Sequence, residues 1–178
     1  MTHLPESMLA GYRSFMTGRY TSESTRYRTL AREGQAPEIM VIACCDSRAA
    51  PESIFDAGPG EMFVVRNVAN LVPPYTPDGS HHSTSAALEF AVMSLGVKHI
   101  VVMGHGRCGG IRAAVQDSSP LTHTDFIGSW MRAVKDVTRI VPREEGCDDA
   151  LHERLIERAS IEHSLANLRT FPWIRMKE

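Results

Sequence analysis

Apolar side chains recur along this chain at two spacings, one typical of amphipathic helices and one typical of buried strands. Near the N-terminus, Met8, Tyr12 and Phe15 recur at helical spacing, with Pro5 close to the start of the predicted helix. Comparable patterns predict further helices over residues 22–33, 83–95 and 126–137, one that begins near residue 109, and a last one that is entered through residues 148–149 and ends before residue 171. Three short apolar runs, residues 39–44, 62–65 and 100–103, predict strands.

Strands and helices alternate along the sequence, which is the order that produces a parallel sheet covered by helices. The run from Ile100 to Met103 is continuous and apolar, as is typical of a strand covered on both faces. No repeat, low-complexity tract or linker divides the 178 residues. We therefore expect a single domain over residues 1–178, of the α/β class, with a mostly parallel central sheet flanked by helices.

Composition narrows the class of protein and its partners. The chain is 43% hydrophobic and 22% charged, as in ordinary globular proteins, and its formal net charge of −2 gives no reason to expect nucleic acid or an anionic membrane as a partner. We see neither an apolar segment of the roughly 20 residues that span a bilayer nor the basic flank and apolar block of a signal peptide. We therefore expect a cytoplasmic protein, whose four cysteines are thiols or metal ligands.

Two groups of reactive side chains follow two of the predicted strands. Residues 44–48 read Cys-Cys-Asp-Ser-Arg, and residues 104–110 read Gly-His-Gly-Arg-Cys-Gly-Gly. Functional groups gather beyond the carboxyl ends of strands in an open parallel sheet. If the two strands are neighbours, Cys44, His105 and Cys108 converge on one point.

These three side chains have the chemistry of a zinc site. Zinc favours thiolate and imidazole ligands in tetrahedral geometry, and three protein ligands leave a fourth position for water. His105 and Cys108 alone are weak support, because the same pair is compatible with a turn histidine beside a buried thiol. A second cysteine, Cys44, at another strand end favours the metal site. Other histidines, such as His152, lack a partner at ligand spacing and are expected at the surface.

Taken together, Cys-x-Asp-Ser-Arg from residue 44 and Gly-His-x-x-Cys-Gly-Gly from residue 104 resemble the motifs of the beta-class carbonic anhydrases. Residues 63–71, Phe-Val-Val-Arg-Asn-Val-Ala-Asn-Leu, and residues 85–92, Ser-Ala-Ala-Leu-Glu-Phe-Ala-Val, also resemble family blocks. Gln35-Ala36-Pro37 before the first strand is similar to the plant-type branch. The resemblance runs from about Leu9 to Ile174.

This resemblance implies roles for individual residues. It makes Cys44, His105 and Cys108 the ligands of one zinc ion per chain, and Asp46 and Arg48 the catalytic dyad. The positions that match the substrate pocket of the family are Gln35, Phe63, Val68, Phe90 and Gly109. The resemblance also implies a homodimer, or a tetramer built from dimers, with N-terminal helices that reach onto the partner and a pocket that both chains line.

The implied activity is the reversible hydration of carbon dioxide to bicarbonate and a proton by zinc-bound hydroxide. Two alternatives stay open. Hydrolysis of carbon disulfide or carbonyl sulfide would use the same site, and the motifs do not separate these substrates. A non-catalytic protein that binds zinc or bicarbonate is the other alternative, although a purely structural zinc site has no need of the Asp46–Arg48 pair.

The chain departs from the family pattern in two places. Many relatives carry tyrosine where this chain has Phe90, which removes a hydroxyl and keeps the aromatic wall. Relatives usually continue beyond the region of residues 171–174 into another core strand. The domain is therefore expected to be short at its C-terminus.

Overall fold

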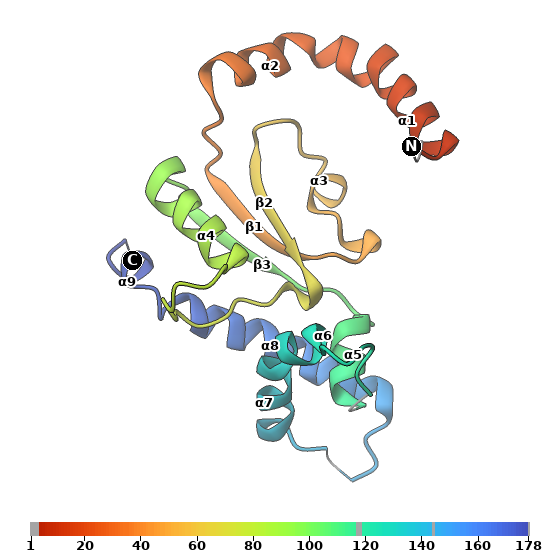
Figure 1. The fold of residues 1–178 in the computed structure, drawn as a ribbon, viewed down its shortest axis with the longest axis vertical. Helices are drawn as coiled ribbons and strands as arrows, with labels where there is room; N and C mark the ends of the chain where they lie inside the picture. Colours follow the sequence, from red (N-terminus) through yellow and green to blue (C-terminus); the bar gives the residue numbers. More distant parts are fainter. Residues whose placement is uncertain (1–3, 117–118, 144, 178) are drawn as a thin grey trace.

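A central parallel sheet organises the molecule. The computed structural model describes residues 4–116, 119–143 and 145–177. Within them, strands β1 (Ile39–Cys44), β2 (Met62–Asn67) and β3 (His99–Met103) form one sheet in the order β2-β1-β3 (Figure 1). Both strand pairs are parallel. The predicted α/β class, with a parallel sheet flanked by helices, is confirmed.

The central strand β1 forms the core. Every residue from Met40 to Cys44 is buried, because β1 pairs with a strand on each side and its side chains pack into two clusters. Met40 packs in a cluster with Leu88 and Phe171. Cys44 packs in the other cluster with Ile111. This double cover explains why the sequence of β1 is continuously apolar rather than alternating.

Helices surround the sheet and supply the remaining core residues. They are α1 (Glu6–Thr17), α2 (Arg19–Glu33), α3 (Pro51–Ile54), α4 (Ser83–Glu89), α5 (Gly109–Val115), α6 (Phe126–Trp130), α7 (Arg132–Ile140), α8 (Asp149–Leu168) and α9 (Pro172–Arg175). Two 3-10 turns, η1 (Ser47–Ala49) and η2 (Val68–Asn70), and a π-helical segment, η3 (Phe90–Leu95), complete the described elements.

Helix ends follow the chemistry of their capping residues. The side chains of Asp125 and Asp148 accept backbone N–H groups of the first turns of α6 and α8, which satisfies donors that a helix leaves free. Gly34 follows α2 with φ of 86° and donates its N–H to the Leu30 carbonyl, as glycine does after many helices.

Several predicted boundaries differ from the structure. The helix predicted over residues 22–33 begins earlier, at Arg19. The helix predicted over residues 83–95 is α4 followed by the π-helical segment η3. The helix predicted over residues 126–137 is interrupted at Met131. Apolar periodicity continues through both interruptions, so it gave no sign of either.

Burial also differs from prediction at two positions. Val101 in β3 is 38% exposed, so the prediction that both faces of this strand are covered is wrong there. The reason is that β3 lies at the edge of the described sheet and pairs only with β1. His152, predicted at the surface, is 8% exposed on α8, and its Nδ1 atom has no hydrogen-bond partner among the described residues.

The N-terminal helices stand apart from this core. Neither α1 nor α2 contains a buried residue, and Figure 1 shows both helices arching away from the sheet. Polar contacts to the loop before β2 hold α2 in place: Arg26 donates to the Pro59 carbonyl at 2.6 Å and to Glu61 at 3.0 Å.

None of the helices in the described part of the chain has the length and apolar content that crossing a membrane requires.

Candidate metal centre

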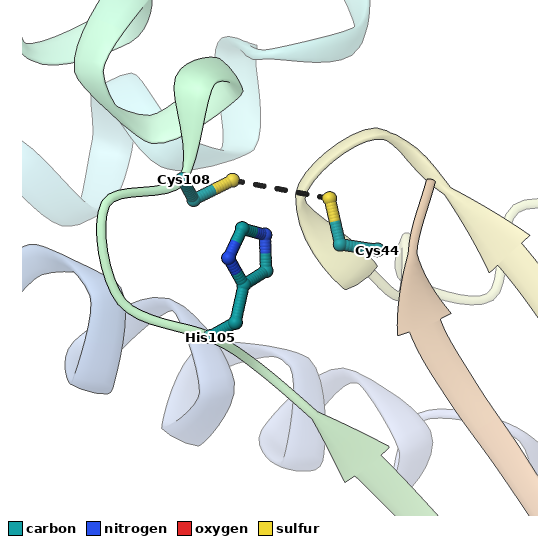
Figure 2. Close-up of side chains that lie close together, drawn as sticks. All are labelled: Cys44, His105 and Cys108. Atoms are coloured by element: carbon teal, nitrogen blue, oxygen red, sulfur yellow. Dashed lines mark hydrogen bonds between the residues drawn. The ribbon is translucent and has the colours of Figure 1, made fainter. Parts of the chain in front are cut away.

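Three side chains that are distant in sequence meet where two neighbouring strands end. Cys44 is the last residue of β1, and residues 104–108 form the turn that follows β3. The donor atoms of Cys44, His105 and Cys108 all lie within 4.8 Å of one another. Figure 2 shows the two sulfur atoms facing each other, 4.0 Å apart, with the imidazole of His105 beside them.

This geometry fits a tetrahedral metal ion. Zinc–sulfur bonds of about 2.3 Å at tetrahedral angles place two sulfur atoms roughly 3.8 Å apart, close to the distance seen here. The Nε2 atom of His105 is buried and has no hydrogen-bond partner among the described residues. Its Nδ1 atom lies 3.1 Å from the Gly106 carbonyl oxygen. A proton on Nδ1 would donate to that oxygen and leave the Nε2 lone pair for a metal.

The protonation of the Cys108 thiol responds to its surroundings. Burial, with a smaller contribution from the neighbouring Cys44, raises the pKa of the Cys108 thiol to about 11. Burial has this effect because it disfavours the charged thiolate. A divalent cation would reverse this balance, because thiols are deprotonated when they coordinate metal.

Two glycines allow the turn after β3 to pack closely. A Cβ atom at Gly104 would lie 2.5 Å from Ile161 of α8, and one at Gly110 would lie 2.8 Å from Val68. A larger residue at either position would force the neighbouring side chain to move. The left-handed position of the turn is taken by Arg107, with φ of 56°, rather than by a glycine.

Hydrogen bonds from other elements fix the same turn. The N–H of Cys108 donates to a carboxylate oxygen of Glu157 on α8 at 2.9 Å. The carbonyl oxygen of Arg107 accepts a hydrogen bond from Arg48 at 3.1 Å. Arg48 therefore links the segment after β1 to the turn after β3.

Asp46 and Arg48 form a two-point ion pair beside the three donors. Arg48 donates from Nε to Oδ1 at 2.9 Å and from Nη2 to Oδ2 at 2.8 Å. Its backbone N–H also donates to Oδ1 at 2.9 Å. These hydrogen bonds, with the guanidinium charge, hold the pKa of Asp46 well below its usual range. Asp46 is therefore ionised at neutral pH.

Arg66, at the end of β2, is a contributor that the sequence reasoning missed. Its Nε donates to the Cys44 carbonyl at 2.9 Å, and its Nη2 donates to the Asp46 carbonyl at 2.7 Å. It thereby fixes the backbone on both sides of the first turn of the site. A charged residue that ends an apolar strand beside such motifs is the signal that could have identified it.

The turn after β2 places Val68 against the same site. The amide of Asn67 bonds both the N–H and the carbonyl of Leu71, at 2.8 Å and 2.9 Å, and closes the turn. Trp130 on α6 donates its indole N–H to the Val68 carbonyl at 2.8 Å. Trp130 thereby holds the turn that carries Val68, a predicted pocket residue.

The five predicted pocket residues divide into two groups. Val68 and Gly109 lie at the carboxyl end of the sheet, beside Gly110 and Cys108 respectively. Gln35, Phe63 and Phe90 lie elsewhere in the chain, away from the three donors.

The second group lies toward the amino end of the sheet. Gln35 is exposed in the segment before β1. Phe63 is paired with Met40, whereas Asn67 is paired with Cys44. Four strand residues at about 3.3 Å each separate Phe63 from that end by roughly 13 Å. Phe90 lies against Phe63, with ring centroids 5.8 Å apart, and is 48% exposed.

Comparison with known proteins follows the same motifs. The sequence matches the family model described as "Carbonic anhydrase" over residues 39–178. It is 38% identical to beta carbonic anhydrase 5, chloroplastic, of Arabidopsis thaliana, over 99% of this chain and 58% of that protein. The chain belongs to the beta-class carbonic anhydrases. The resemblance predicted from the motifs is thus confirmed.

Other relatives agree with this family. Beta carbonic anhydrase 3 of Arabidopsis thaliana is 36% identical over 96% of this chain and 66% of its own length. The chain therefore spans less than two thirds of both Arabidopsis relatives. The structure of the beta-carbonic anhydrase CcaA matches with a TM-score of 0.88 at 27% identity, over 97% of this chain and 76% of that one.

A structure from Sordaria macrospora matches with a TM-score of 0.82 at 31% identity, over 96% of this chain and 83% of that chain. It is described as one of two tetrameric beta-carbonic anhydrases.

The expected cytoplasmic compartment of this chain and its extent as one domain over residues 1–178 stay predictions.

Proposed function

We propose that this chain catalyses the reversible hydration of carbon dioxide to bicarbonate and a proton at a zinc ion held by Cys44, His105 and Cys108. The observation that carries the proposal is the convergence of these three donor atoms within 4.8 Å. The buried Nε2 atom of His105, which has no other partner among the described residues, supports it further. Membership of the beta-class carbonic anhydrases supports the reaction.

Zinc in this position would supply an acidified water, and so a nucleophile near neutral pH. Asp46 would orient that water. Oδ1 of Asp46 already accepts two hydrogen bonds from Arg48, whereas Oδ2 accepts one. Oδ2 is therefore the oxygen that retains an acceptor position. It would accept a hydrogen bond from the attacking water and direct the water's lone pair at the carbon of carbon dioxide.

Arg48 keeps Asp46 available for that task. The two-point ion pair holds the carboxylate ionised and turned toward the guanidinium. Asp46 is not part of the group of donor atoms that lie within 4.8 Å of one another. Without Arg48, Asp46 would be free to turn and compete for the fourth metal position, which would close the site to water.

The test is zinc quantitation together with a carbon dioxide hydration assay, on the wild-type chain and on Asp46→Ala. We expect one zinc per chain in both proteins and a large loss of hydration rate in Asp46→Ala. An assay of the same samples with carbon disulfide decides between the two substrates. Zinc-loaded wild type with no hydratase activity would overturn the proposal and favour a non-catalytic binding protein.

We also propose that the active form is a homodimer in which each pocket takes residues from both chains. Phe63 lies roughly 13 Å along β2 from the strand end that meets the donors. Phe63 and Phe90 are therefore poorly placed to line the pocket of their own chain. A second copy, related by a two-fold axis, would bring this aromatic pair to the other chain's metal centre.

The N-terminal helices support the same assembly. Met8 and Tyr12, one helical turn apart on α1, are 60% and 61% exposed, and α1 and α2 contain no buried residue. An amphipathic helix without a buried face gains little stability from its own chain. Contact with a second copy would cover these side chains and hold the two pockets together.

Mixed dimers test this sharing of residues directly. A Cys44→Ser chain lacks a metal donor, and a Phe63→Ala/Phe90→Ala chain lacks the aromatic pair. If each pocket is shared, the mixed dimer contains one site with intact donors from one chain and intact aromatics from the other. Purified through two different tags, it should recover about half of the wild-type rate. A mixed dimer no more active than its parents would overturn the shared pocket.

A further inference from the structure

A large groove borders the metal centre without being part of it. It has a volume of about 680 Å³ and lies between the turn of residues 104–107, α5 and one face of α8. His105 is the one metal donor in its lining; Cys44, Cys108, Asp46 and Arg48 are absent from it. The volume is in the range of small-molecule sites.

The lining of this groove is strongly basic. Four arginines contribute to it, namely Arg107, Arg112, Arg154 and Arg158, against two carboxylates. One of the carboxylates, Glu153, pairs with Arg112 at 3.2 Å. The other, Glu157, accepts the N–H of Cys108. The groove therefore keeps a net positive charge of two from these side chains.

Three of its arginines have no charged partner among the residues that the structure describes. Within residues 4–116, 119–143 and 145–177, the side chains of Arg107, Arg154 and Arg158 make no hydrogen bond or ion pair. Arg154 and Arg158 lie one turn apart on the same face of α8. Like charges at this spacing destabilise a helix. An anion bound between the two guanidinium groups would relieve this repulsion.

We infer that this groove binds a soluble oxyanion of the phosphate class. The guanidinium group is planar and presents paired donors that match two oxygens of a phosphate. Arg154 and Arg158 on the helix and Arg107 on the turn would offer more donors than a planar, singly charged anion can use. A tetrahedral dianion matches both the net charge and the donors.

A ligand in this groove would lie against the turn that carries two of the candidate metal donors. Arg107 lines the groove, and its carbonyl oxygen accepts the hydrogen bond from Arg48. Glu157 lines the groove and also holds the Cys108 N–H. A bound oxyanion would thus contact the turn that carries His105 and Cys108 from outside. Its binding does not depend on which reaction the metal centre performs.

The test uses inorganic phosphate as the probe and the zinc-loaded full chain labelled with 15N. Amide shifts are followed during titration, with sodium chloride at equal ionic strength as the salt control. We expect saturable shifts confined to residues 104–107 and 150–161. Arg154→Ala/Arg158→Ala should bind phosphate at least tenfold more weakly. Arg139→Ala/Arg175→Ala removes the same charge from arginines outside the groove and should bind as wild type does.

Three results would overturn the inference. In the first, no saturable shift occurs, or chloride produces the same shifts as phosphate. In the second, the shifts centre on Cys44 and Asp46, so that the ion occupies the metal centre instead. In the third, the two double variants lose affinity equally, which would mean a general effect of net charge. Thermal unfolding of each variant checks that the fold is retained.

Discussion

The candidate functional side chains are arranged differently at the two ends of the parallel sheet. At the carboxyl end, Cys44, His105 and Cys108 converge, and Arg66 and Glu157 hold the backbone around them from inside the same chain. Toward the amino end, the predicted pocket residues have no such convergence.

The aromatic pair shows the difference most clearly. Phe63 and Phe90 lie against each other, yet Phe90 is 48% exposed although it is a large apolar side chain. One chain therefore carries a self-contained set of candidate metal donors and, separately, an exposed apolar pair. If the proposed function is right, catalysis and assembly depend on different ends of one sheet, so substitutions at the two ends should fail in different ways.

The largest effect is expected at the carboxyl end, from Cys44→Ser. Loss of one thiolate from three donors should remove bound zinc and lower the hydration rate at least about 1000-fold. Cys45→Ser is the matched control, because Cys45 is adjacent in sequence but exposed. Zinc content by mass spectrometry and the stopped-flow hydration rate check both variants. Full zinc in Cys44→Ser, or equal losses in both, would contradict the assignment.

Zinc affinity should also depend steeply on pH. The pKa of the Cys108 thiol is raised to about 11, so protons compete with zinc for this thiol throughout the neutral range. Because this thiol must lose one proton to bind zinc, affinity should rise with pH by about tenfold per unit, or about 100-fold between pH 6 and 8. Competition with a chelator at pH 6, 7 and 8 measures this slope. An affinity that is constant between pH 6 and 8 would show that the Cys108 thiol is already ionised.

Two substitutions of Arg48, also at the carboxyl end, separate the effect of its charge from the effect of its two-point geometry. Arg48→Ala should keep zinc but lower kcat/KM by about 100-fold, because Asp46 loses the partner that holds it away from the metal. Arg48→Lys keeps the charge without the two-point geometry, so its kcat/KM should lie between those of wild type and Arg48→Ala. Steady-state kinetics with zinc quantitation measure both. A lysine variant as active as wild type would show that charge alone is sufficient.

The metal donors could be predicted from sequence because local spacing and sheet topology are enough to place them. Cys44 and the turn of residues 104–108 each follow an apolar strand, and parallel neighbouring strands bring their carboxyl ends together. The same holds for the Asp46–Arg48 pair, whose members are two residues apart. Family resemblance added the pocket positions, but it did not show which end of this sheet each of them occupies.

Contacts between distant elements could not be predicted in this way. Glu157 accepts the Cys108 N–H from a helix position 49 residues away, and nothing in the periodicity of α8 distinguishes it from the other acidic residues of that helix. The π-helical segment at Phe90–Leu95 and the break at Met131 likewise leave no trace in apolar spacing. These features depend on tertiary packing, which cannot be inferred from the spacing of residues in a single sequence.

The smallest effect is expected at the partner-facing surface, from Met8→Glu/Tyr12→Glu on α1. Both side chains are exposed in the single chain, so the fold of the chain should be unchanged. If a second copy covers them, buried charge should weaken the dimer at least about tenfold. Sedimentation velocity over a dilution series measures this, and hydration activity should fall in parallel as the chains separate. Ile140→Glu is the matched control, since Ile140 is 73% exposed and lies on α7, outside the N-terminal helices α1 and α2. A dimer equally stable in wild type and the α1 variant would remove these helices from the interface, while the mixed-dimer experiment would still decide whether Phe63 and Phe90 act across it.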